Sequence, residues 1–588
     1  MEKPMKMTLV NEAPQGEEWV YEVKYDGFRA LLEWSEQRVR LMSRNGKDLS
    51  DRFPEITSLA EISPPPSEPV TLDGELVILN TPYQSNFPLL QQRGRLRNEK
   101  KIRDAALSRP ATFIAFDYIS DPVLPYTKRR KLLEAFVLSL SSERLALIKS
   151  FEDWEEIRNL VFTHRGEGII AKAKQSRYTY GKRTSDWKKI KNWRHVSGFL
   201  TSFTPENDYY GLGVWDRNSP LPLGKFKHGL NEEEAQTLRT FFMNKGVQKG
   251  KVWTLEPSVC VDVTCLHAEE GELREPSFHQ FRFDMKAEDC TIEKVEWDLA
   301  QFPENVDFSH TGKNLWPGVT KRDYMHYLRK IAPYMLPFLK DKKLTLIRYP
   351  DGIDETSFYQ KHLPDHAPDY VEAFVEKGES FILCPSLSPL LWLGNQGALE
   401  FHIPFQKAGA EEPDEIVFDL DPPDRDRFPD VIFAARLLKH LLDELKVYSF
   451  VKTSGNKGMQ VHIPIEEGTM TYEETRKFTE AIVTLMVWQY PDLFTIERLK
   501  KNRGGRLYLD YVQHAEGKTI IAPYSTRATE QATIATPLFW EEVEEGLRPE
   551  QFTLPTIMER VETFGDPFAD FHRVKGLQPV DIMKKLKG

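Results

Sequence analysis

The spacing of apolar residues changes twice along this 588-residue chain and divides it into three parts. Residues 1–193 alternate strand-like and helix-like periodicity, whereas residues 194–295 carry short strands and turns with a single helical segment. Residues 296–588 begin with a linker-like stretch over 297–314 and return to mixed α and β periodicity. Because one hydrophobic core rarely organises a chain of this length, the pattern predicts a multidomain protein with an α/β domain, a small β-barrel and a second α/β domain.

The composition is that of an ordinary globular protein, with 40% hydrophobic residues, 29% charged residues and a net charge of -10. No apolar run reaches membrane-spanning length, and the first residues lack the apolar core of a secretory signal. The cysteines show neither zinc spacing nor a disulfide framework, which fits a reducing cytoplasm: Cys260, Cys265, Cys290 and Cys384. Local basic runs still allow nucleic-acid binding, and they span 91–103, 127–131, 182–194 and 498–506.

Lys24 lies two residues before Asp26-Gly27, inside a strand-like run over residues 19–34. A single K-x-D-G pattern is a weak signal, because a surface lysine before a turn has the same spelling. Further motifs follow Lys24 in order: SRNGKDLS (43–50), LDGEL (72–76), FIAFDY (113–118), EGIIAK (167–172) and WKKIK (187–191). The ordered set is far more specific than any member alone.

This ordered set resembles the covalent nucleotidyltransferases: ATP-dependent DNA ligases, RNA ligases and mRNA capping enzymes. The resemblance implies that Lys24 attacks the α-phosphate of ATP, so its amine must be partly deprotonated near neutral pH. Lys189, Lys191 and a bound Mg²⁺ would supply the positive charge that favours the neutral amine and stabilises the phosphate. The resemblance further implies ribose contact by Glu75, base stacking by Phe116, metal binding by Glu167, and ribose or phosphate contacts by Arg29 and Arg44.

Residues 194–295 resemble the OB-fold that follows the transferase domain in ligases. Their last segment, 273–286, resembles the closing motif of the family, whose arginine and lysine orient the leaving pyrophosphate. Arg282 and Asp284 match this motif, but Met285 stands where the lysine is expected and Lys286 follows it. Self-adenylylation is therefore expected to be less efficient or to use Lys286.

In the second half, a strand ending in paired aspartates is expected over EIVFDLDPP (415–423). Alternation places Asp419 and Asp421 on one face, and the prolines end the strand. A further strand, RLYLDYVQ (506–513), contributes Asp510. A single D-L-D is more often a polar strand end than a site, but three converging carboxylates are typical of two-metal phosphoryl transfer.

KTSGNKG (452–458) offers backbone N–H groups and lysines to a triphosphate, without the order of a Walker A loop. With 348–361, 397–402 and 519–527, it resembles the archaeo-eukaryotic primase-type polymerases fused to bacterial end-joining ligases. The resemblance makes Asp419, Asp421 and Asp510 metal ligands. It assigns nucleotide contacts to His402, Ser454, Lys457, Gln513 and Arg527, a DNA 5′-phosphate to Lys313 and Lys321, and the template side to Phe358 and Tyr359. Gln460 replaces the usual histidine of S-G-x-K-G-x-H, and His462 lies two residues further on, so no role is assigned there.

Together the halves resemble the ligase D type of bacterial non-homologous end joining, with the ligase first and the polymerase last. No phosphoesterase segment is expected. The resemblance implies ATP, Mg²⁺ or Mn²⁺, DNA with breaks, gaps or nicks, a bacterial Ku homodimer as partner, a nucleoid-associated cytoplasmic location and a preference for ribonucleotides. Three alternatives stay open: a capping-type guanylyltransferase, a replication primase with a residual ligase, and a non-catalytic end-bridging scaffold.

Overall fold

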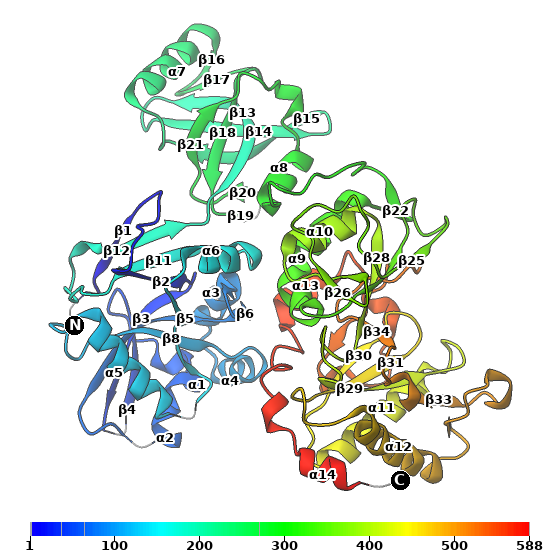
Figure 1. Cartoon of the computed structure of the whole chain (residues 1–588). Coiled ribbons are helices and arrows are strands. Elements are labelled where there is room, and N and C mark those ends of the chain that lie inside the picture. Colours follow the sequence, from blue (N-terminus) through cyan, green and yellow to red (C-terminus); the bar gives the residue numbers. More distant parts are fainter. Residues whose placement is uncertain (1–2, 37, 64, 141, 270, 587–588) are drawn as a thin grey trace. The chain divides into compact units, whose positions relative to one another are not determined.

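The computed structural model describes residues 3–36, 38–63, 65–140, 142–269 and 271–586. The chain separates into two compact units, Met1–Phe302 and Pro303–Gly588, which run from blue to green and from green to red in Figure 1. Helix α8 (Ile292–Ala300) packs on strand β13 (Arg194–Thr204), and the Arg194 guanidinium donates to the carbonyl of Leu299 at 3.0 Å. The first unit therefore extends to residue 302, beyond the expected boundary at 295.

The first part of unit one holds two five-stranded sheets. One sheet has the order β1 (Lys6–Leu9), β12 (Arg183–Lys191), β11 (Gly168–Ala173), β2 (Trp19–Lys24) and β10 (Ser150–Phe151). The other has the order β4 (Arg38–Ser43), β3 (Phe28–Ser35), β5 (Val70–Val77), β8 (Thr112–Tyr118) and β9 (Leu145–Leu147). The helices of this part are α1 (Pro54–Thr57), α2 (Leu59–Ile62), α3 (Phe87–Arg95), α4 (Glu99–Ser108), α5 (Tyr126–Leu138) and α6 (Trp154–Thr163).

The run over residues 19–34 is not one strand, which corrects the sequence-based expectation. It breaks after Lys24, and β2 and β3 belong to different sheets. Gly27 permits the break, because a Cβ atom at this position would lie 2.5 Å from the carbonyl oxygen of Leu76. Lys24 is therefore the last residue of its strand.

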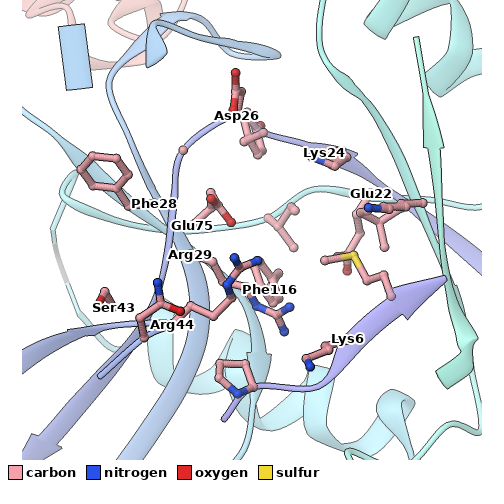
Figure 2. A pocket seen from close by; sticks show the side chains of 18 of the residues that line it. Lys6, Glu22, Lys24, Asp26, Phe28, Arg29, Ser43, Arg44, Glu75 and Phe116 are labelled. Atoms are coloured by element: carbon pink, nitrogen blue, oxygen red, sulfur yellow. The ribbon is translucent and has the colours of Figure 1, made fainter. Parts of the chain in front are cut away.

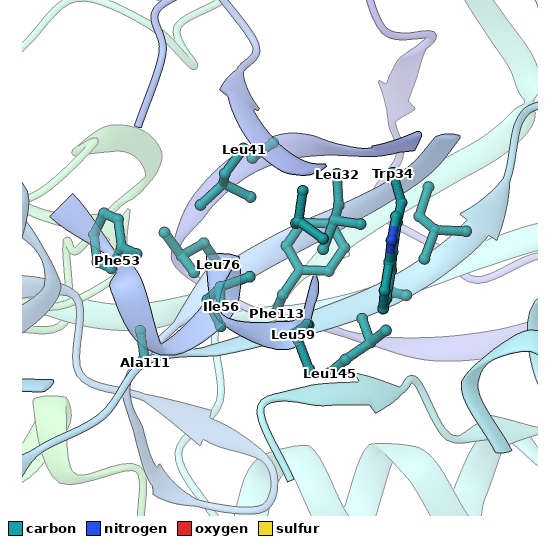
Figure 3. Close-up of a cluster of buried hydrophobic side chains, with 14 of the residues drawn as sticks. Leu32, Trp34, Leu41, Phe53, Ile56, Leu59, Leu76, Ala111, Phe113 and Leu145 are labelled. Carbon is teal, nitrogen blue, oxygen red and sulfur yellow. The ribbon is translucent and has the colours of Figure 1, made fainter. Parts of the chain in front are cut away.

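The second sheet of this part is buried on both faces. Leu32, Trp34 and Phe113 pack with residues of α1, α2 and α5 on one face (Figure 3). Leu31 and Phe116 belong to a separate cluster on the other face, together with Trp187 from the first sheet. Burial of each large apolar side chain stabilises the fold by about 1.5–3 kcal/mol. Alternation along β3 and β8 thus directs Phe116 away from the helices and toward the first sheet.

Residues 194–302 form a seven-stranded sheet with the order β15-β14-β13-β17-β16, in which β18 also pairs with β13 and β21 pairs with β18. Besides β13, its strands are β14 (Tyr209–Asp216), β15 (Ser219–Phe226), β16 (Val247–Lys249), β17 (Val252–Thr254), β18 (Cys260–Cys265) and β21 (Ser277–Phe281). Helix α7 (Glu232–Lys245) starts at a capping box in which Asn231 and Glu234 exchange side-chain-to-backbone hydrogen bonds.

Unit two is built on a six-stranded and a four-stranded sheet. The first has the order β32 (Phe494–Thr495), β33 (Leu507–Asp510), β29 (Glu415–Asp421), β31 (Met459–Pro464), β30 (Phe450–Thr453) and β35 (Pro537–Leu538). The second has the order β25 (Phe358–Gln360), β24 (Thr345–Arg348), β28 (Ala398–Pro404) and β34 (Thr519–Ile521). The main helices are α9 (Lys321–Leu339), α10 (Leu387–Asn395), α11 (Phe428–Glu444), α12 (Tyr472–Gln489), α13 (Ile557–Phe564) and α14 (Val580–Lys585).

Across the described ranges, none of the helices combines the length and the apolar character that crossing a membrane requires.

A buried ion pair ties α5 to the second sheet of unit one. Arg129 binds Asp117 through two hydrogen bonds of 2.8 and 2.9 Å, and both side chains are fully buried. The same guanidinium donates to the carbonyl of Ser176 at 2.9 Å. Loss of either partner would leave an uncompensated charge in the interior.

We expect Arg129→Ala to destabilise the ligase half by about 3–5 kcal/mol, because Asp117 would stay buried without a partner. Arg158→Ala is the matched control, since Arg158 pairs with Glu155 at 2.9 Å on the surface and should contribute less than about 0.5 kcal/mol. Thermal unfolding of the full chain measures both. Equal unfolding temperatures for the two variants would contradict the assigned role of Arg129.

Candidate active sites

A large cavity of about 960 Å³ opens between the two sheets of the first part of unit one. Its walls include most of the residues that the sequence predicted for the ligase site: Lys24, Arg29, Arg44, Glu75, Phe116 and Lys189. Figure 2 shows Lys24, Arg29, Glu75 and Phe116 around the same hollow. The cavity is large enough for a nucleotide, and about half of the residues that line it are charged.

Lys24, a residue of the cavity wall, pairs with Glu167. Residue 168, which follows Glu167, lies directly opposite Lys24 in the register of β11 and β2, so the strand pairing sets this contact. The two side chains are 18% and 13% exposed. Burial raises the pKa of Glu167, and Lys24 opposes that rise. The second carboxylate oxygen, Oε2, is buried and has no hydrogen-bond partner among the described residues. A divalent cation would satisfy it, so the donor set fits the expected metal.

The two lysines of β12 differ in their surroundings. Lys189 lines the cavity, and burial together with the charges of Lys191 and Lys24 lowers its pKa. Lys191 instead forms an ion pair with Glu275 at 2.5 Å and is not among the described residues of the cavity wall. Of the two predicted lysines, Lys189 alone is among the described residues of the cavity wall.

Charged groups lie around Phe116 in the cavity wall. Arg29 binds Asp73 through hydrogen bonds of 3.1 and 2.6 Å, and its guanidinium lies 5.5 Å from the centre of the Phe116 ring. Burial raises the pKa of Glu75 to about 8, while Lys24 and Arg29 oppose the rise.

The sequence analysis assigned no role to Glu22 or Lys172, which also line the cavity. They pair at 2.7 Å, and Lys172 donates to the carbonyl of Phe116 at 2.8 Å. The position of Lys172 at the end of the motif EGIIAK was the available signal.

Arg282 and Met285 lie in the strand region of residues 194–302. Arg282 pairs with Asp284 at 2.8 Å and with Asp262 at 3.2 Å, and among the described residues it is not part of the cavity wall. The Met285 sulfur lies 3.7 Å from that of Cys290 and packs against the local core, whereas Lys286 is exposed. Met285, a partly buried side chain that packs against the core, thus occupies the position at which the lysine was expected.

A second cavity, of about 250 Å³, lies in unit two. It brings together residues from β28, β29, the loop between β30 and β31, and the segment around residues 513–527. Its walls contain the predicted residues His402, Asp419, Asp421, Ser454, Lys457, Gln513 and Arg527. Groups far apart in the sequence therefore converge as the motifs predicted.

Asp419, Asp421 and Asp510 lie at the adjoining ends of β29 and β33. Asp419 is directly opposite Asp510 in the strand register. Burial, with the added charges of Asp421 and Asp510, raises the pKa of Asp419 to about 7. A cation between these carboxylates would relieve this repulsion, and hard oxygen donors suit Mg²⁺ and Mn²⁺.

The side chains do not form a ready-made cage: within the described ranges, no three His, Cys, Asp or Glu side chains are grouped as a metal site. Asp421 is held by Lys457 at 3.0 Å and by Arg503 at 3.4 Å. Asp510 accepts hydrogen bonds from the Tyr508 hydroxyl at 3.1 Å and from the backbone N–H of Gln513 at 2.9 Å. The three-carboxylate metal site therefore stays a prediction that requires Asp421 to exchange partners.

The loop between β30 and β31 is held by a hydrogen bond between its own residues. The Ser454 hydroxyl accepts from the Gly458 N–H at 3.1 Å. Gly455 has a φ of +70°, and a Cβ atom there would lie 2.7 Å from the Arg527 side chain. Arg527 pairs with Glu400 at 3.1 Å, and Glu400 also bonds His402 at 3.1 Å. Glu400, which the sequence analysis did not identify, thus orients two of the predicted nucleotide contacts.

The residues predicted to contact DNA lie outside this cavity. Lys313 pairs with Asp351 at 2.7 Å, and burial lowers the pKa of Lys321 to about 8 with help from Lys313. Phe358 and Tyr359 are 43% and 74% exposed on the edge strand β25. Exposed aromatic side chains on an edge strand are available for base stacking.

Comparison with known proteins assigns both units. The family model described as the LigD primase-polymerase domain matches residues 320–568, and that of the ATP dependent DNA ligase domain matches residues 3–191. The chain is 41% identical to the bifunctional non-homologous end joining protein LigD of Bacillus subtilis, covering 99% of both. It is 27% identical to the multifunctional non-homologous end joining protein LigD of Pseudomonas aeruginosa, covering 97% of this chain and 72% of that protein. A solved polymerase domain of Mycobacterium tuberculosis Ligase D, in complex with DNA, is 27% identical, with a TM-score of 0.43; the match covers 47% of this chain and 100% of that one.

The chain is therefore an enzyme with an ATP-dependent DNA ligase domain and a primase-type polymerase domain. It belongs to the LigD family of non-homologous end-joining proteins. The family and the two catalytic domains predicted from the sequence are confirmed.

We expect Glu167→Gln to raise the Mg²⁺ concentration needed for covalent AMP labelling of the chain by at least about tenfold, because the amide keeps the shape of the side chain but loses its charge. The Lys24→Ala variant gives the background. Glu152→Gln is a matched control, since Glu152 pairs with Lys174 at 3.1 Å on the surface. An unchanged Mg²⁺ dependence in Glu167→Gln would exclude Glu167 as the metal ligand.

Proposed function

We propose that this chain repairs broken DNA ends by extending or filling them with its second unit and sealing them with its first. The observation that carries the proposal is the presence, in one chain, of two separate cavities, each lined by the motif residues of a different nucleotidyl transfer. Broken DNA with gaps or nicks is the proposed substrate, and ATP is consumed in sealing.

In the ligase unit, the Lys24 amine attacks the α-phosphorus of ATP, forms a P–N bond and displaces pyrophosphate. The AMP then passes to a DNA 5′-phosphate, and attack by the neighbouring 3′-hydroxyl closes the strand and releases AMP. Lys189 and Arg29 add positive charge to the cavity, which stabilises the transferring phosphate. We assign ribose contact to Glu75, base stacking to Phe116 and phosphate contacts to Arg44, with Lys191 and Arg282 joining after a rearrangement that frees them from Glu275 and Asp262.

In the polymerase unit, Asp419, Asp421 and Asp510 would hold Mg²⁺ or Mn²⁺. Such ions, when bound, activate the attacking 3′-oxygen and neutralise the triphosphate. Ser454, Lys457 and Arg527 surround the proposed triphosphate position, and His402 and Gln513 complete the nucleotide site. We propose that Lys313 and Lys321 bind a DNA 5′-phosphate, that Phe358 and Tyr359 meet the template, and that ribonucleotides are preferred.

Three further assignments concern the strand region 194–302, a protein partner and a location in the cell. We infer that the strand region 194–302 is an OB-fold that closes on the ligase site, as its sheet order and closing motif suggest. A bacterial Ku homodimer is the proposed protein partner, and the nucleoid within the cytoplasm is the proposed location. Both proposals rest on the proposed action of this chain on broken chromosomal DNA.

A gapped duplex with a 5′-phosphate, supplied with ATP and nucleotides, tests the proposal. The native chain should fill and seal it, Lys24→Ala should fill without sealing, and Asp419→Asn should seal a nick but not fill a gap. Each loss should exceed about 1,000-fold, because each variant removes a group that acts directly in the reaction.

Sealing by Lys24→Ala or extension by Asp419→Asn would overturn the proposal. Covalent labelling from GTP instead of ATP would favour a capping-type guanylyltransferase, and synthesis without a primer would favour a replication primase.

A further inference from the structure

Three neighbouring strands of unit two place Lys452, Gln460 and Asp419 side by side. Gln460 of β31 lies directly opposite Asp419 of β29 on one side and Lys452 of β30 on the other. Lys452 is fully buried, and Gln460 is 3% exposed. The sequence analysis offered Lys452, as a lysine of the motif KTSGNKG, to a triphosphate, and it assigned no role to Gln460.

The hydrogen bonds within this row have only one consistent direction. A lysine ammonium can only donate, and Lys452 Nζ donates to Gln460 Oε1. The amide nitrogen of Gln460 must then face the other way, and it donates to Asp419 Oδ1 at 3.2 Å. Lys452 thereby determines which end of the Gln460 amide is the oxygen and which is the nitrogen. One oxygen of Asp419 is therefore hydrogen-bonded within the protein.

Gln460 lines the same cavity as the proposed triphosphate contacts, but its side-chain hydrogen bonds go to Lys452 and Asp419. Ser454 and Lys457 belong to the loop that follows β30, and Arg527 is held by Glu400. His462, next but one to Gln460, is buried and bound to Glu415 at 2.9 Å, so it is not placed to act at the cavity. Gln460 is therefore directed at a carboxylate, not at the position expected for a phosphate.

The charges of the row support one another. The Lys452 ammonium and the Asp419 carboxylate carry opposite charges, so each favours the charged form of the other across the Gln460 amide. The amide of Gln460 lies between these two groups and carries no charge of its own. The Gln460 amide thus orients Asp419 without a cationic side chain in direct contact with its carboxylate. Asp421, in contrast, pairs directly with Lys457 and Arg503.

We propose that Lys452 and Gln460 are positioning residues that orient Asp419 for divalent-cation binding, so that Gln460 serves the metal side of the polymerase site and not the triphosphate side. This inference rests on the proposed polymerase function. It gives a role to the glutamine that replaces the histidine usual in the motif.

The test uses two variants of similar volume, Lys452→Met and Gln460→Met, which a packed interior tolerates best. Mn²⁺ binding to the nucleotide-free full chain is measured by electron paramagnetic resonance, and the binding lost in Asp419→Asn defines the polymerase site. Primer extension then gives kcat and the nucleotide KM at saturating Mn²⁺. Both Met variants should weaken Mn²⁺ binding at this site by about tenfold, with the nucleotide KM changed by less than about twofold.

His462→Gln is the matched control, because it alters another buried polar residue of β31 that pairs across to β29; its Mn²⁺ binding should be unchanged. Thermal unfolding checks the fold of each variant. If Lys452→Met unfolds below the assay temperature, Lys452→Gln replaces it, and this variant should show an intermediate loss because its amide can still donate to Gln460.

A raised nucleotide KM with unchanged Mn²⁺ binding would place Gln460 on the triphosphate and overturn the inference, as would unchanged values in both Met variants. Primer extension that survives in Asp419→Asn would instead refute the proposed polymerase site itself. The two failures are therefore distinguishable.

Discussion

The register between neighbouring antiparallel strands is the constraint on which both candidate sites depend. In unit one, Lys24 lies opposite Gly168, which brings Glu167 to its amine. In unit two, Asp419 lies opposite Asp510 on one side and Gln460 on the other. A slip of one residue would turn every side chain of a strand to the opposite face. The apolar residues that alternate with these charges pack in the interior and so fix the register.

Buried carboxylates pair with several of the cationic groups that line each cavity. Asp73 holds Arg29, Glu22 holds Lys172, and Glu400 holds both Arg527 and His402. Such pairs contribute little net stability when desolvation is included. Their effect is to keep long side chains in one geometry, which a site for a flexible triphosphate requires. The two units reach this arrangement on different sheets.

Much of this arrangement could be predicted, since motif order identified Lys24 and its cavity partners. Alternation likewise placed Asp419 and Asp421 on the face that lines the second cavity. What could not be predicted depends on partners distant in the sequence. The break in the strand before Gly27 depends on the close approach of the Leu76 carbonyl oxygen. The ion pair with Glu275 determines where the Lys191 side chain lies. Local patterns carry no information on such contacts.

The proposed ligase reaction requires that AMP is attached covalently to Lys24. Peptide mapping of the AMP adduct determines which residue is modified. The native chain, stripped with pyrophosphate and reloaded with ATP and Mg²⁺, is digested and analysed by mass spectrometry. We expect a single AMP-modified peptide, with the modification on Lys24. An adduct on Lys189 or Lys191, or a fully active ligase without any adduct, would contradict this expectation.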